Sequence, residues 1–216
     1  MKKTLLSFLI LFCLQFSPAK AQWVTIPDAN FVIWLQTNYP TCMNGNLMDT
    51  TCSDIIYDNY VNLYNLNISD LSGIEYFNNL IDLDCSYNQL TSLPILPNGL
   101  TNLSFHFNQI SNISSLPDSL WYLNCSFNSL TNLPVNLPNN LHDLICSNNQ
   151  LSTLPNLPIT LDGLFCQSNQ LSNLPTSFHY TVKLLQQPFI KSSKPSKFIR
   201  LFCMFTKSII KSSKFT

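Results

Sequence analysis

The hydrophobic pattern of this chain recurs every 20 residues. From Leu80 the sequence reads LIDLDCSYNQLTSLPILPNG, and units with the same spacing of leucine, asparagine and proline begin at Leu100, Leu120, Leu141 and Leu161. The unit from Leu120 has one extra residue, and a degenerate unit begins at Val61. Self-similarity at this period is typical of a solenoid, in which a unit buries its leucines only by stacking on its neighbours.

Each unit predicts one short strand and one extended return. In the LxxLxC segment, alternation turns Leu83, Cys85 and their equivalents inward, and successive strands would stack in parallel ~4.8 Å apart. The LPxLP segment returns in an extended conformation, because proline fixes φ and lacks an N–H. The expected fold is therefore a solenoid with short parallel β-strands on the concave face and an extended, turn-rich convex side.

An asparagine occupies the position in each unit where the chain leaves the strand. This column consists of Asn88, Asn108, Asn128, Asn149 and Asn169. A side-chain amide carries two donors and an acceptor, so it can satisfy backbone groups at this turn in unit after unit. We expect the column to be structural.

The LxxLxCxxNxLxxLPxLP pattern of residues 61–175 resembles the leucine-rich-repeat family, in particular the short bacterial subclass found in effector proteins of pathogens. The Cys-Ser-x-Asn-Gln-Leu motif within the repeat resembles secreted or surface proteins of environmental bacteria more than it resembles the effectors. The resemblance implies a leucine-rich-repeat domain over residues 61–177. The ubiquitin-ligase domain of the effectors has no counterpart in this sequence.

The first 21 residues have the features of a secretory signal peptide. Met1-Lys2-Lys3 is a positive start, Leu5 to Phe16 is an apolar run too short to span a membrane, and Ala19-Lys20-Ala21 is a small-x-small cleavage site. We expect export, cleavage after Ala21, and a secreted or cell-surface protein without a membrane span.

Residues 22–60 are expected to cap the repeats, because the end of a solenoid exposes core and a strand edge. Asp28 can cap a helix of about two to three turns. The apolar residues on one face of that helix are Phe31, Trp34 and Leu35. Cys42 and Cys52 flank a polar loop, and in an exported chain this spacing suits a disulfide worth roughly 2–3 kcal/mol.

Charge is divided sharply along the chain. All eleven acidic residues lie between Asp28 and Asp162, and residues 22–182 contain no Lys or Arg, which gives this segment a formal charge of −11. Such a charge repels nucleic acid and anionic lipid, so we expect no nucleic-acid partner. The eight basic residues beyond the signal peptide lie between Lys183 and Lys214.

Residues 178–216 form a basic tail without the repeat pattern. Within this tail Ile-Lys-Ser-Ser-Lys occurs at 190–194 and again at 210–214, an offset equal to the repeat period of 20. Codons that encode KSIIKSSKFT can also encode NQLSNLPNL when read from the second base. We interpret the tail as a shifted reading frame of further repeats from a longer parent protein. The alternatives are a basic membrane-binding tail and a disordered tail.

The sequence shows no pattern typical of a catalytic or metal site. Cys85, Cys125, Cys146 and Cys166 share a strand column with Phe105, which indicates buried apolar side chains rather than metal ligands. The histidines are expected to be scattered surface residues: His106, His142 and His179. Without a nucleophile–base pair or a phosphate loop, we predict that the chain is not an enzyme and uses no cofactor or metal.

Strand residues that alternate with the inward leucines would line the concave face, where aromatic side chains gather among acids. The candidate ligand-binding residues are Asp82, Asp84, Tyr87, Phe107, Trp121, Tyr122, Asn124, Phe127, His142, Asp143 and Phe165. Such groups are typical contacts for a protein or glycan ligand, although a solvated sheet with scattered aromatics is the alternative. We predict a non-catalytic binding scaffold; the alternative function is a structural spacer or adhesin stalk.

The shifted-frame interpretation predicts the DNA sequence of the gene. An independent read from the codon of Leu161 to beyond that of Thr216 should show a shifted frame that stays open and encodes further LxxLxCxxNxLxxLPxLP units. If that frame closes at once, or the codons do not permit NLPNLP, the interpretation is wrong and the basic tail is genuine.

Overall fold

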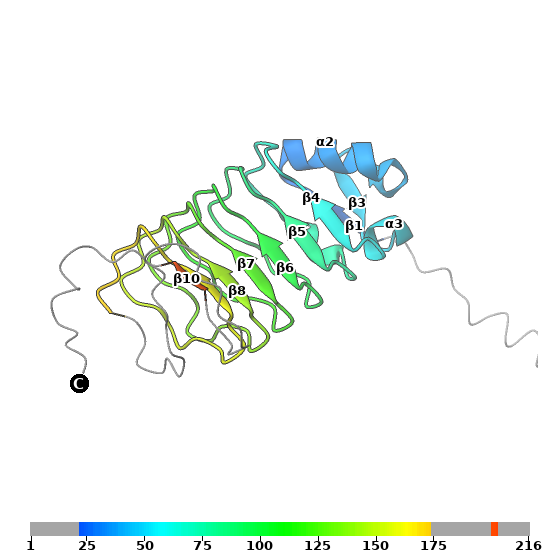
Figure 1. Cartoon of the computed structure of the whole chain (residues 1–216). Helices are drawn as coiled ribbons and strands as arrows, with labels where there is room; N and C mark the ends of the chain where they lie inside the picture. The colour runs from blue at the N-terminus through cyan, green and yellow to red at the C-terminus, as the bar shows by residue number, and fades with distance from the viewer. Residues whose placement is uncertain (1–21, 174–199, 203–216) are drawn as a thin grey trace, which may run out of the picture.

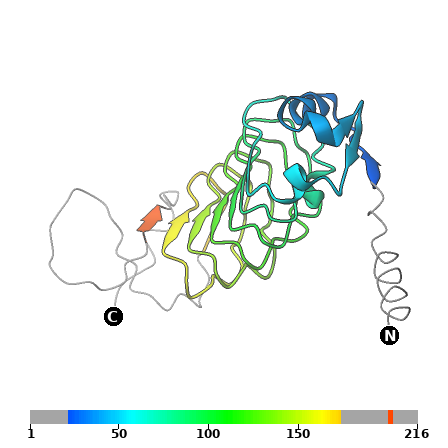
Figure 2. The ribbon, with the colours of Figure 1, turned by 90° about the vertical axis from the view of Figure 1, so that its right-hand side faces the viewer.

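The computed structural model describes residues 22–173 and 200–202. The predicted signal peptide and most of the predicted tail lie outside the described residues. Figure 1 shows a row of stacked rungs with a small helical cap at the N-terminal end, and Figure 2 shows the same stack turned by 90°. Among the helices of the described ranges, none is long and apolar enough to cross a membrane.

The rungs are held together by one parallel sheet. Its strands are β4 (Tyr60–Asn62), β5 (Asp82–Asp84), β6 (Asn102–Ser104), β7 (Tyr122–Asn124), β8 (Asp143–Ile145), β9 (Gly163–Phe165) and β10 (Arg200–Phe202). From β4 to β9 each strand pairs with the next strand in the chain, and β10 pairs with β9. The central leucines pair in register, so the expected leucine-rich-repeat solenoid with short parallel strands is confirmed.

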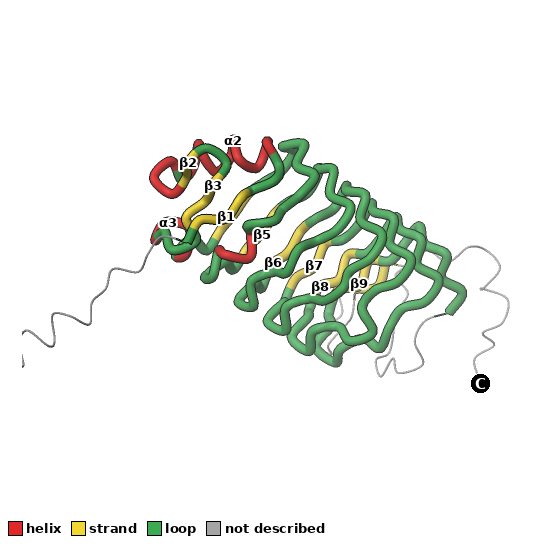
Figure 3. Tube along the Cα trace, turned by 180° about the vertical axis from the view of Figure 1, so that it is seen from behind, coloured by secondary structure: helices red, strands yellow, loops and turns green. Residues whose placement is uncertain are grey.

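The segments that return from one strand to the next contain almost no regular structure. A 3-10 helix, Ile74–Tyr76, follows the first rung; between β5 and β9 the described chain returns through loops and turns, which Figure 3 shows from behind. A return of this kind suits a rung of 20 residues, which is too short to close around a helix of several turns. The extended, turn-rich side is therefore confirmed.

The leucines of each rung form one continuous core between the sheet and the returns. In the rung of β5 the side chains of Leu80, Leu83, Cys85 and Leu90 are fully buried, and Phe105 is equally buried in the cysteine column. Burial of a leucine side chain stabilises the fold by roughly 2 kcal/mol, and each rung reaches this only between two neighbours.

The asparagine column joins each rung to the rung before it. Asn149 Nδ2 donates to the carbonyls of Cys146 and Ser147 in its own rung, at 3.2 Å each, and to Cys125 of the preceding rung at 3.0 Å. Its Oδ1 accepts from the backbone N–H of Leu130 in the preceding rung at 2.9 Å. Asn88, Asn108, Asn128 and Asn169 repeat this scheme.

The cap covers the end of the sheet at β4. Its elements are β1 (Trp23–Thr25), α2 (Ala29–Asn38), a 3-10 helix (Pro40–Cys42), β2 (Met43–Asn44), β3 (Leu47–Asp49) and α3 (Ser53–Ile56). The three strands form an antiparallel sheet in the order β1-β3-β2. On α2, the side chains of Phe31 and Leu35 are buried and Trp34 is partly buried, so the expected N-terminal helical cap is confirmed.

One carboxylate fixes α2 to the first rung. Asp28 Oδ1 accepts from the backbone N–H groups of Asn30 and Phe31 and so caps the helix. Asp28 Oδ2 accepts from the backbone N–H and the hydroxyl of Ser69, both at 2.8 Å, and from the N–H of Asp70 at 3.4 Å. The side chain that begins the helix therefore also holds the loop after β4.

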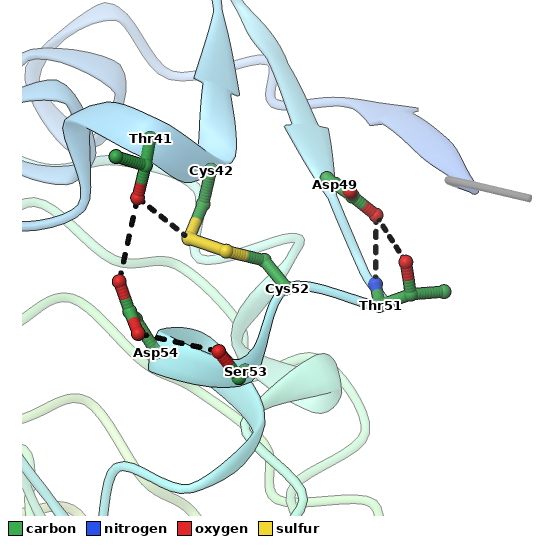
Figure 4. Close-up of a disulfide and its surroundings, with 7 residues drawn as sticks. All are labelled: Thr41, Cys42, Asp49, Thr51, Cys52, Ser53 and Asp54. Carbon is green, nitrogen blue, oxygen red and sulfur yellow. Dashed lines mark hydrogen bonds between the residues drawn. A yellow bond between two sulfur atoms is a disulfide. The ribbon is translucent and has the colours of Figure 1, made fainter. Parts of the chain in front are cut away.

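A disulfide closes the cap below these strands. The structure joins Cys42, at the end of the 3-10 helix, to Cys52, just before α3, with a Cα–Cα distance of 5.6 Å (Figure 4). Thr41 Oγ1 donates to Asp54 Oδ2 beside it. Among the described residues, Cys42, Cys52 and Asp54 form a group close enough to hold a metal ion, but the disulfide uses both sulfurs and leaves one carboxylate.

Removal of one amide from the asparagine column should destabilise the fold. In the Asn149→Ala variant the N–H of Leu130 and several carbonyls lose their partner, so the free energy of unfolding should fall by about 2–4 kcal/mol, measured by urea denaturation. The matched control is Asn132→Ala, since the exposed Asn132 side chain contacts Thr131 Oγ1 at 3.4 Å. Equal losses in the two variants would contradict this role for Asn149.

Candidate interaction face

The sheet has one face packed on the core and one face turned away from it, which we call the sheet face. In β5 to β8 the central leucine is buried, whereas the residues on either side are partly exposed on the sheet face. The structure thus brings together on this face six of the residues predicted to bind a ligand, each partly exposed. These are Asp82, Asp84, Tyr122, Asn124, Asp143 and Phe165.

The remaining predicted residues flank the strands. Trp121 and His142 precede β7 and β8, and their rings stack with centroids 5.2 Å apart. Tyr87, Phe107 and Phe127 follow β5, β6 and β7. The sheet face is therefore a polar strip bounded at both ends of its strands by aromatic side chains.

The aromatic residues beyond the strands form a continuous stack. The rings of Tyr87 and Phe107 have centroids 4.3 Å apart and an interplanar angle of 20°, and those of Phe107 and Phe127 are 4.0 Å apart at 10°. Tyr64 adds a tilted ring 5.0 Å from Tyr87. We call Tyr64, Tyr87, Phe107 and Phe127 the aromatic ladder; between 37% and 47% of each side chain is exposed.

The backbone under the ladder is left-handed. Tyr87, Phe107 and Phe127 have φ values of 56°, 52° and 51°, a region that bulky side chains rarely occupy and that asparagine tolerates better. In other rungs the equivalent residues are Asn65, Asn148 and Ser168, also with positive φ. The turn out of each strand thus requires this conformation, and three consecutive rungs fill it with an aromatic residue.

A polar cluster centred on His106 lies beside the ladder. The Ser86 and Ser104 hydroxyl oxygens are 2.6 Å and 3.0 Å from His106 Nδ1, and Asn124 Nδ2 is 3.4 Å from it. Burial lowers the pKa of His106, while the charge of Asp84 acts in the opposite direction. The expectation that His106 is a scattered surface residue is therefore wrong in part, because the side chain is partly buried and contacts side chains from three rungs.

Within residues 22–173 the sheet face has no positive side chain to balance its acids, and Arg200 lies on β10, beyond β9. Residues 22–173 contain all eleven acidic residues and no Lys or Arg. Burial raises the pKa of Tyr122, and the carboxylates of Asp143, Asp84 and Asp82 act in the same direction. At β9 the Asp143 carboxylate covers the buried Gly163, because a Cβ on Gly163 would collide with it.

The cysteine column lies on the opposite side of the strands, within the core. Cys85, Cys125 and Cys146 are buried with free thiols. Burial raises the pKa of Cys146 to about 12 and raises the pKa values of the other two as well. These thiols stay protonated at neutral pH, so they pack as small apolar side chains, as Phe105 does in the same column.

Sequence reasoning found the columns of this face but missed two of its features. It placed Tyr87, Phe107 and Phe127 in one column without showing that their rings stack or that their backbone is left-handed. Asn148 in that column was an available signal, because asparagine is enriched at positive φ. His106 also had a signal, since Ser86 and Ser126 occupy its column in the neighbouring units.

Comparison with known proteins supports the repeat assignment. A family model, the FNIP repeat, matches residues 87–128, and no curated protein sequence matches the chain. The leucine-rich-repeat domain of a Shigella effector is 28% identical, with a TM-score of 0.56, over 80% of this chain and 68% of that one.

Two further solved structures are similar over smaller shares of their own length. YopM from Yersinia enterocolitica WA-314 is 40% identical over 45% of this chain and 22% of that chain, with a TM-score of 0.44. A functional domain of InlJ from Listeria monocytogenes, which includes a cysteine ladder, is 24% identical over 72% of this chain and 45% of that chain, with a TM-score of 0.46. The repeat, the parallel sheet and the similarity to the Shigella effector domain together show a leucine-rich-repeat solenoid fold.

The His106 cluster predicts a measurable titration. The imidazole should titrate below its ordinary pKa of 6.5 in an NMR experiment, and Asp84→Asn should lower the pKa further because it removes a favourable negative charge. Because the folded pKa is lowered, the unfolded chain binds the proton more readily, and the stability contributed by neutral His106 is lost as pH falls from 6.5 through the folded pKa. Asp118→Asn, at an exposed position outside the strands, is the control. A pKa at or above 6.5, or an equal effect of both variants, would contradict the assignment.

Proposed function

We propose that the chain is a non-catalytic interaction scaffold that binds a macromolecular partner, a protein or a glycan, on its sheet face. The observation that carries the proposal is the aromatic ladder, because four partly exposed rings beside uncompensated acids form a contact surface without a role in the core. The similarity to the leucine-rich-repeat domain of a Shigella effector supports a scaffold of this kind.

The chemistry of the face favours binding over catalysis. Among the described residues, Ser86 and His106 most resemble a nucleophile–base pair, because Ser86 Oγ lies 2.6 Å from His106 Nδ1. The Ser86 side chain is fully buried, however, and its hydroxyl is also 3.1 Å from that of Ser104, so a substrate cannot reach it. The pair therefore orders the face and has no access to a reacting bond.

We further propose that the protein acts outside the cell or at its surface. The predicted signal peptide of residues 1–21 and the disulfide between Cys42 and Cys52 support export, since disulfides persist in oxidising compartments. The structural spacer or adhesin stalk remains the alternative function, and it needs no exposed aromatic column.

Truncation of aromatic side chains on the sheet face distinguishes a binding scaffold from a spacer. The variant Trp121→Ala/Tyr122→Ala/Phe127→Ala removes aromatic side chains from the sheet face. Partners retained by the immobilised wild-type chain, from a protein extract and a glycan array, should bind this variant at least roughly tenfold more weakly in titrations with the purified partner.

The matched control truncates apolar residues on the returning segments. These residues are Ile95, Val135 and Ile159, whose side chains are 80%, 83% and 75% exposed. The control variant should bind as the wild-type chain does, and all three proteins should melt similarly. If no ligand distinguishes the face variant from the wild-type chain, the spacer function is correct and the proposal is wrong.

A further inference from the structure

The geometry of the aromatic ladder restricts the chemistry of the partner. Phe107 has Tyr87 stacked on one side and Phe127 on the other, with centroids 4.3 Å and 4.0 Å away. Both faces of this ring are therefore closed by neighbouring rings. Tyr87 is closed in the same way, by Phe107 on one side and by the tilted ring of Tyr64 on the other.

Closed ring faces disfavour a sugar ligand. Stacking of a sugar ring or of a cation needs the open face of an aromatic ring, where the π electrons lie. Between its end rings, Tyr64 and Phe127, the ladder instead presents ring edges across successive rungs. A row of apolar edges fits aliphatic side chains, which pack without needing a ring face.

The backbone indicates that these rings are not required by folding. Rungs with Asn148 and Ser168 make the same left-handed turn that Phe107 and Phe127 make. An aromatic residue costs more than asparagine at positive φ, and such outliers persist where the surrounding structure or function requires them. Since more than a third of each ring is exposed, the core does not require them, and contact with a partner remains as their role.

The negative charge of the sheet face determines the sign of the charge that its partner carries. Asp82, Asp84 and Asp143 lie on the strands beside the ladder, and residues 22–173 include no Lys or Arg to balance them. The basic residue that the structure describes on this sheet, Arg200, lies on β10 at the far end, beyond β9. Complementary charge speeds association and excludes partners of the same sign. A partner of this face must therefore carry positive charge.

We infer that the aromatic ladder docks an extended, lysine- or arginine-rich protein segment whose aliphatic side chains pack along the ring edges while its cationic groups reach the carboxylates of the sheet face. This inference rests on the proposed function and names the class of partner. It excludes a neutral glycan and an acidic protein as the ligand of the ladder.

The test uses the full chain and three peptides of equal length that can span the ladder. One peptide contains Lys, Leu and Gly, the second replaces Lys by Glu, and the third replaces Leu by Ser. In calorimetric titrations the first peptide should bind at least roughly tenfold more tightly than either of the others, and its affinity should fall with added salt. A neutral oligosaccharide is the fourth probe and should not bind.

The ladder is tested by a substitution that the fold already accepts. In Phe107→Asn/Phe127→Asn the new residues match Asn65 and Asn148, so the variant should melt no lower than the wild-type chain. Its affinity for the Lys/Leu peptide should drop by roughly tenfold or more. A charge variant, Asp82→Asn/Asp84→Asn/Asp143→Asn, should bind weakly and lose the salt dependence.

The control for the charge variant removes three carboxylates that lie outside the sheet face. Asp54→Asn/Asp70→Asn/Asp118→Asn removes the same charge at exposed positions outside the sheet face and should leave peptide affinity within about twofold. Binding of the oligosaccharide at the ladder, equal binding of the Lys and Glu peptides, or unchanged binding in the asparagine variant would each overturn the inference. A partner lost by the alanine variant at Trp121, Tyr122 and Phe127 but kept by the asparagine variant would leave the proposed function intact and refute this inference alone.

Discussion

Where the chain leaves a strand inside a solenoid, its backbone N–H and C=O groups must find hydrogen-bond partners away from water. Strands of three residues supply few such partners. The asparagine column meets this requirement, since one amide joins carbonyls of two rungs and an N–H of the preceding return, as Asn149 does. Because some of these bonds stay within the rung and others cross to the preceding rung, the same amide closes the turn and sets the stacking. The leucine core, the sheet register and the position of the exposed face all depend on this alignment.

The periodic positions could be predicted from the sequence because a repeated residue implies a repeated environment. The spacing of Leu83 and Cys85 was sufficient to orient the strands, and Phe105 within the cysteine column was sufficient to indicate burial. Relations between rungs could not be predicted in the same way. The stacking of Tyr87 on Phe107 depends on backbone angles, and the contacts of His106 depend on which side chains of three neighbouring rungs converge. Periodicity identifies columns, whereas packing decides how the members of a column meet.

The ladder illustrates how a repeat protein acquires a distinct surface without a change in its backbone conformation. The turn after each strand adopts positive φ whether it holds an asparagine, a serine or an aromatic residue. Rungs are therefore interchangeable in backbone and different in side chain. Three aromatic rungs in succession create a surface that no single rung has, while Asn148 ends the stack on one side.

Asp28 makes the junction between the cap and the first rung sensitive to acid. Burial raises the pKa of this carboxyl, but hydrogen bonds from Ser69, Phe31 and Asp70 outweigh burial and leave the pKa below 3.8. The stability it contributes is therefore complete above pH 3.8 and is lost as pH falls through the lower, folded pKa. Since α2 and the loop after β4 share this one carboxylate, its protonation releases helix and rung together. Each rung contacts only its neighbours, so the loss of this carboxylate's bonds weakens the cap and the first rung before it affects rungs farther along the stack.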